Sequence, residues 1–149
     1  MGEDMSTYVY GPVPSRRLGR SLGIDLVPLK TCTYDCLYCQ LGKTTHKTTK
    51  RQEWAPPEEV ITQLRTQLVC EPDIITISGS GEPTLHAGIG SLIQAIKAMT
   101  PIPVAVLTNS SLLWLPEVRD ALCSADVVIP SLDAGNEHLF RQVNRPHRD

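Results

Sequence analysis

Short apolar runs alternate with segments of helical periodicity along most of this chain of 149 residues. The strand-like runs cover residues 22–27, 73–77, 102–107 and 126–129. Each is followed by apolar side chains at helical spacing, namely Val60, Ile61, Leu64 and Leu68, then Ile89, Leu92, Ile93 and Ile96, then Val118, Ala121 and Leu122, and finally Leu139, Phe140 and Val143. Nearly continuous apolar strands are typical of parallel sheets that are covered on both faces. The order therefore predicts an α/β fold, a parallel (βα)₄ half-barrel.

Four such units make about half of a closed barrel, because a (βα)₈ barrel needs roughly 200 residues or more. An open half would leave a flat apolar sheet edge exposed, which natural sheets avoid. We therefore expect residues 1–149 to form the amino-terminal part of a larger barrel, truncated at its carboxyl end. No change of composition or linker divides the chain, and residues 1–20 precede the first strand as a lead-in segment.

Three cysteines follow the first predicted strand, at Cys32, Cys36 and Cys39, with the spacing CxxxCxxC. Thiolates this close in sequence can converge on a soft metal centre, and iron–sulfur clusters are held in this way. A [4Fe–4S] cluster takes four ligands, yet no fourth cysteine lies nearby. Three ligands would leave one iron open to a molecule that is not protein. An open metal position favours chemistry over a purely structural role.

Two other interpretations of the cysteines have to be weighed. His46 could complete a zinc site, which would make the chain a non-catalytic structural module. A disulfide framework is disfavoured because no secretion signal opens the sequence, and we expect a cytoplasmic protein. Cys70 and Cys123 stand alone at the ends of predicted helices, where a small buried apolar side chain is the ordinary interpretation.

Polar and small residues follow the other predicted strands, at the points where each strand ends. Sites in parallel sheets gather at these carboxyl ends. Glu82 could accept hydrogen bonds from an ammonium group, and Asn109 or Asp133 could bind a ribose or a carboxylate. Thr108 and Ser131, taken singly, are equally consistent with helix capping.

Positive charge is concentrated at the start of the chain, although the whole carries a net charge of −2. Residues 1–51 hold eight Lys or Arg against four Asp or Glu, which is compatible with an anionic partner such as RNA. The polar run 43–50 is better explained as a solvated, flexible loop, because no RNA-binding signature accompanies it. Arg16 and Arg17 could pair with carboxylates in a lead-in strand or reach substrate anions near the cysteines. No apolar run reaches membrane-spanning length.

The CxxxCxxC spacing, Tyr38 before the last cysteine, and the turn Gly79-Ser-Gly81-Glu82 together resemble the radical S-adenosylmethionine superfamily. The resemblance runs from Cys32 to the fourth strand and makes residues 1–149 a core domain with a partial, TIM-like barrel. Ser80 stands where the family's GGE motif has a glycine.

The resemblance implies a [4Fe–4S] cluster on Cys32, Cys36 and Cys39, with S-adenosylmethionine on its open iron. Reductive cleavage would then give methionine and a 5′-deoxyadenosyl radical that abstracts hydrogen from a substrate. An electron donor such as flavodoxin or ferredoxin is implied as a partner. The cofactor-binding residues implied are Gly79, Gly81 and Glu82 at the methionyl ammonium, Tyr38 by the adenine, Thr108, Asn109 and Ser131 by the carboxylate or ribose, and Asp133 by the ribose.

Residues 11–19 and 21–25 resemble one group within that superfamily, the Fe–S oxidoreductases related to wyosine-forming tRNA enzymes. Those enzymes use a second cluster whose cysteines precede the radical loop, whereas no cysteine precedes Cys32 here. The substrate is thus unassigned, with RNA among the candidates. An inactive fragment of a longer enzyme is a further alternative.

Overall fold

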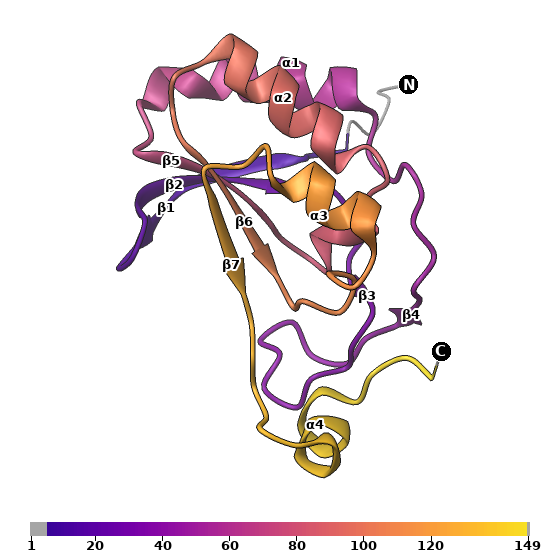
Figure 1. The fold of residues 1–149 in the computed structure, drawn as a ribbon. Coiled ribbons are helices and arrows are strands. Elements are labelled where there is room, and N and C mark those ends of the chain that lie inside the picture. The colour runs from indigo at the N-terminus through magenta and orange to yellow at the C-terminus, as the bar shows by residue number, and fades with distance from the viewer. Residues whose placement is uncertain (1–5, 149) are drawn as a thin grey trace, which may run out of the picture.

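One five-stranded sheet, in the order β1-β2-β5-β6-β7, forms the centre of the computed structural model, which describes residues 6–148 (Figure 1). Its strands are β1 (Val9–Ser15), β2 (Gly19–Asp25), β5 (Ile74–Ser78), β6 (Val104–Thr108) and β7 (Val127–Pro130). The last four are parallel, and β1 runs antiparallel to β2 at one edge. A second, two-stranded sheet pairs β3 (Thr31–Cys32) with β4 (His46–Lys47).

Helices connect the parallel strands and lie on one face of the sheet (Figure 1). They are α1 (Pro57–Gln67), α2 (Ile89–Met99) and α3 (Pro116–Leu122), with 3₁₀ helices at Leu68–Cys70 and Pro83–Leu85. Crossovers that all return on the same side curve a parallel sheet toward a barrel. The α/β prediction is confirmed, with a mostly parallel sheet consistent with a partial barrel. No helix in the described part is both long and apolar enough to cross a bilayer.

The core lies between the sheet and these helices, because successive strand residues face opposite sides. Leu22, Ile24 and Ile77 are fully buried on the helical side, and each contributes about 1.5–3 kcal/mol through burial. The other face mixes polar and apolar side chains. The Ser21 and Thr76 hydroxyl oxygens lie 2.5 Å apart on it, and Ile74 and Leu107 share that face. The sheet therefore has one face that makes the core and an opposite face of mixed polarity.

Strand β1 explains the lead-in segment, although Pro12 and Pro14 obscure it in the sequence. Proline is tolerated there because β1 is an edge strand that pairs only with β2. Arg16 and Arg17 fall in the turn between the two strands, at the amino end of β2. Seven residues of β2 place this turn roughly 20 Å from the cysteines' end of the strand. The interpretation that set these arginines near the cysteines is therefore wrong, and none of the three ion pairs within residues 6–148 includes them.

The fourth predicted helix exists as α4 (Glu137–Asn144), but it does not join the helical layer (Figure 1). It lies beyond the carboxyl ends of the strands, where Phe140 packs edge-on against Tyr34 with ring centroids 5.3 Å apart. Strand β7 therefore stays at the sheet edge, with Val127 and Val128 exposed.

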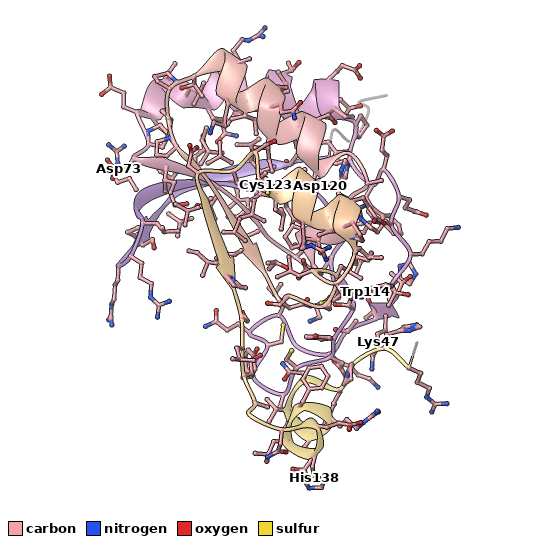
Figure 2. The ribbon with its side chains drawn as sticks, viewed as in Figure 1. Lys47, Asp73, Trp114, Asp120, Cys123 and His138 are labelled. Carbon is pink, nitrogen blue, oxygen red and sulfur yellow. The ribbon has the colours of Figure 1, made fainter. Side chains whose placement is uncertain are left out.

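Two smaller expectations need correction. Cys123 is exposed rather than buried, because it caps the end of α3 on the outer layer (Figure 2), whereas Cys70 is half-buried against the core. The run 43–50 is not a wholly solvated loop, since it contains β4 and the buried Thr44. The Thr44 amide donates to the Asp35 carboxylate at 2.7 Å, which ties this run to the cysteines.

Candidate functional site

A hollow of about 270 Å³ opens at the carboxyl ends of the parallel strands, beside the cysteine loop (residues 26–45). It is lined by Cys32, Cys36, Ser78, Gly79, Gly81, Glu82, Leu107, Thr108, Asn109 and Ser131, and we call it the carboxyl-end hollow. The lining includes two of the three cysteines and six of the eight residues predicted to bind a cofactor. The parallel order brings them together because every strand ends at this edge.

The glycine turn after β5 is pressed against the cysteine loop. A Cβ atom at Gly81 would lie 1.8 Å from the carbonyl oxygen of Thr31, and one at Gly79 would lie 2.4 Å from the Asp25 carboxylate. Gly79 also has a φ of +107°, a conformation that favours glycine. The Glu82 amide donates to the Thr31 carbonyl at 3.2 Å, which fixes the turn beside Cys32. Both positions therefore require glycine, because a Cβ atom at either would collide with the atoms of the neighbouring segment.

The Glu82 carboxylate is 2% exposed and accepts four hydrogen bonds. Its donors are the Thr84 amide at 3.1 Å, the Thr84 hydroxyl at 2.6 Å, the Thr108 hydroxyl at 2.6 Å and the Asn109 amide at 2.7 Å. Three of these bonds end on Oε1 and one ends on Oε2, and together they join the ends of β5 and β6 through Glu82. Burial raises the pKa of Glu82 above its ordinary value, although the hydrogen bonds from Thr108, Thr84 and Asn109 oppose the shift.

The other two predicted cofactor residues, Tyr38 and Asp133, lie next to the hollow and contact each other. The Tyr38 hydroxyl donates to the Asp133 carboxylate, and burial together with this bond raises the pKa of Tyr38. Asp133 lines a smaller cleft of about 110 Å³, shared with Asn109, Ser131 and Asn144. Seven of the eight predicted residues therefore line two adjoining cavities, and Tyr38 contacts the smaller one through Asp133.

Nitrogen donors reach the sulfurs of all three cysteines. Lys30 Nζ lies 3.1 Å from Cys39 Sγ, Asn144 Nδ2 3.3 Å from Cys36 Sγ, and Asn109 Nδ2 3.5 Å from Cys32 Sγ. Burial raises the pKa of the Cys32 thiol. Burial also acts to raise the pKa of Cys39, but the hydrogen bonds from Lys30 and the Leu41 amide outweigh it, and the pKa is lowered. Sequence reasoning missed Lys30 and Asn144.

The segment that ends α4 holds the cysteine loop through main-chain hydrogen bonds. The Asp35 amide donates to the Asn144 carbonyl and the Leu37 amide to the Val143 carbonyl, each at 2.9 Å. The His147 amide in turn donates to the Thr33 carbonyl at 2.9 Å. No local sequence signal could reveal this contact, because it joins residues about one hundred positions apart.

The zinc interpretation is disfavoured by the position of His46. His46 pairs with Thr31 while Lys47 pairs with Cys32, and neighbouring strand residues face opposite sides. The His46 ring packs edge-on against Trp54, with centroids 5.7 Å apart. Within residues 6–148, no three His, Cys, Asp or Glu side chains surround a single ion position. A [4Fe–4S] cluster makes a different demand, since each thiolate binds its own iron, and three thiols beside an open hollow fit that group.

Residues 26–149 match the radical SAM superfamily. The chain belongs to this superfamily. It is 40% identical over 147 residues to a UPF0026 protein of Methanocaldococcus jannaschii, which covers 96% of this chain and 46% of the relative. A UPF0026 protein of Helicobacter pylori (strain 26695) is 38% identical over 152 residues, or 49% of its length. A protein of Brachyspira hyodysenteriae named GTPase Obg is 48% identical over 143 residues, or 21% of its length.

The chain therefore spans about half or less of the length of these relatives. Membership of the superfamily is shown, whereas the narrower resemblance to the wyosine-related group stays a prediction.

Proposed function

We propose that this chain supplies the radical-generating part of a radical SAM enzyme. It would bind a [4Fe–4S] cluster through Cys32, Cys36 and Cys39, and S-adenosylmethionine in the carboxyl-end hollow and the adjoining cleft. The observation that carries the proposal is the hollow itself, because it joins two of these cysteines to six predicted cofactor residues from three strand ends. When bound together, the reduced cluster and S-adenosylmethionine supply a 5′-deoxyadenosyl radical.

The chain's own residues would bind and orient the cofactor rather than transfer protons. Gly79 and Gly81 let the turn lie directly against Asp25 and the Thr31 carbonyl, which holds the turn beside the cysteine loop. Glu82 fixes that turn to the end of β6, because its carboxylate accepts from Thr84 on one side and from Thr108 and Asn109 on the other. Asp133, held by Tyr38, is available to accept a hydrogen bond from a ribose hydroxyl.

The substrate and the electron donor are the open parts of the proposal. We propose a small one-electron donor of the flavodoxin or ferredoxin class, since the cluster must be reduced before each cleavage. The substrate would meet the face of the sheet opposite the helices, where the Tyr10 and Ser78 hydroxyl oxygens are 3.0 Å apart. Because the chain spans about half of two relatives, the residues that select the substrate are expected outside it.

Anaerobic reconstitution with iron and sulfide tests the proposal. The chain should become brown, with a broad absorption near 400 nm that bleaches on reduction, as expected of thiolate-bound iron–sulfur clusters. Added S-adenosylmethionine and dithionite should then give 5′-deoxyadenosine, and no product should form without dithionite. A colourless chain that binds one zinc tightly and rejects iron would contradict the proposal. A chain with a full cluster but no 5′-deoxyadenosine would support the inactive-fragment alternative.

A further inference from the structure

Each of the three cysteine sulfurs has its own nitrogen donor, and the donors come from different parts of the chain. Lys30 lies within the cysteine loop, Asn109 follows β6, and Asn144 ends α4. Their donor-to-sulfur distances run from 3.1 to 3.5 Å. Lys30 is 6% exposed and Asn144 is 1% exposed, while the cysteines that they contact are half-buried.

We propose that Lys30, Asn109 and Asn144 tune the reduction potential of the cluster, acting as positioning residues on its three sulfur ligands. This inference rests on the proposed function. Reduction adds one negative charge to the cluster, and hydrogen bonds to its sulfurs stabilise the reduced form. Removing a donor should therefore move the potential to more negative values.

Lys30 should have the largest effect of the three because it adds a positive charge to its hydrogen bond. An ammonium group near a half-buried thiolate such as Cys39 interacts more strongly than it would in bulk water. The residue is also held in place, since its amide donates to the Ser80 carbonyl at 2.8 Å. Its backbone has a φ of 60°, which directs the chain back toward the glycine turn.

Asn144 connects its sulfur to the rest of the site. The same Nδ2 atom that reaches Cys36 donates to Asp133 Oδ2 at 2.6 Å, and Asp133 also accepts from Tyr38. The Asn144 Oδ1 atom is buried without a hydrogen-bond partner among the described residues. Such an unpaired buried atom destabilises the fold. Stability alone does not explain an asparagine at this position. The bonds from its Nδ2 atom to Cys36 and Asp133 favour a role for Asn144 at the cluster.

The test measures the midpoint potential of the reconstituted full chain by a dye-mediated titration followed by electron paramagnetic resonance. Variants are Lys30→Met, Lys30→Arg and Asn144→Leu, and iron and sulfide are quantified for each. The matched control is Lys43→Met, which removes the same charge from an exposed position in the same loop. This control separates the effect of the direct hydrogen bond on the midpoint potential from the effect of losing a more distant positive charge.

We expect Lys30→Met to shift the midpoint potential to more negative values at full iron content. Asn144→Leu should shift it in the same direction by a smaller amount. Lys30→Arg should have a potential close to that of the unsubstituted chain. Lys43→Met should leave the potential unchanged. Equal potentials for Lys30→Met and Lys43→Met would overturn the proposal. A Lys30→Met chain that fails to load iron would also overturn it, by assigning Lys30 to cluster assembly. If the unsubstituted chain loads no cluster, the proposed function fails instead.

Discussion

The two ends of the parallel sheet use carboxylates in opposite ways. At the amino end, the exposed Asp73 accepts from the Arg20 amide at 2.6 Å (Figure 2). Asp126, also exposed, accepts from the Val104 amide at 2.8 Å and from Lys97 Nζ at 2.6 Å. Both join neighbouring strands in contact with water, where such bonds contribute little.

At the carboxyl end, Glu82 is buried with four hydrogen-bond donors but no ion-pair partner among the described residues. Burying a carboxylate in this way opposes its ionisation, which the raised pKa of Glu82 reflects. The exposed carboxylates at the amino end carry no comparable cost of burial. The carboxyl end accepts an energetic cost to keep a hollow beside the cysteines, which is typical of functional sites.

The largest effect should come from removing a predicted cluster ligand. Replacing Cys32, Cys36 or Cys39 singly by alanine should reduce the iron and sulfide content of the reconstituted chain to background, because a cluster loses one of three protein ligands. The matched control is Cys123→Ala, since Cys123 is exposed on α3 (Figure 2). Iron loss in the control, or retention of a full cluster in all three site variants, would contradict the assignment.

The next largest effect should follow from adding one methyl group to the glycine turn. Gly81→Ala places a Cβ 1.8 Å from the Thr31 carbonyl oxygen, so the turn and cysteine loop must separate. We expect a loss of more than about 3 kcal/mol in the free energy of unfolding, measured by urea denaturation. Gly135→Ala, where no atom lies within 4 Å of the added Cβ, should change it by less than about 0.5 kcal/mol. Equal effects would show that the carboxyl end is not tightly constrained.

A pH-dependent effect should distinguish the buried carboxylate. Because the pKa of Glu82 is raised in the folded chain, its contribution to stability is present below the ordinary value of about 4.3 and declines as the pH rises toward the folded value. Between these values the unfolded chain ionises first. The free energy of unfolding should therefore fall with pH more steeply in the unsubstituted chain than in Glu82→Gln.

Urea denaturation from pH 4 to pH 8 would measure this difference. Glu58→Gln, on the exposed side of α1, makes the same chemical change away from the site and provides the baseline. A Glu82→Gln chain whose stability follows the same pH curve as the unsubstituted chain would mean that the pKa of Glu82 is the same in the folded and unfolded chains.

The smallest effect is expected at the amino end. Asp126→Asn removes an exposed ion pair and should lower the free energy of unfolding by about 0.5–1 kcal/mol. Hydrogen bonds from Lys97 and from the Val104 amide lower the pKa of Asp126, so its contribution is present above about 3.9 and is lost as the pH falls below that value. Iron loading should be unaffected. A cluster defect in this variant would contradict the division between the two ends.

Sequence periodicity was sufficient to predict the strand order and the convergence of polar residues at one sheet edge, because both follow from local pattern and parallel topology. It could not reveal where α4 packs, since Phe140 has the same spacing whether the helix covers the sheet or the cysteine loop. Nor could it identify Asn144 as a neighbour of Cys36, 108 positions away. The exposure of Cys123 was missed because residue type predicts burial only on average.

We propose that the carboxyl-end hollow binds S-adenosylmethionine at the open iron of a three-cysteine cluster. The most direct test compares electron paramagnetic resonance spectra of the reduced, reconstituted chain with and without S-adenosylmethionine. Binding at the open iron should change the spectrum of the cluster. In Asp133→Ala, a higher concentration of S-adenosylmethionine should be needed to produce the same change. A chain with four irons per molecule whose spectrum is identical with and without S-adenosylmethionine would contradict the claim.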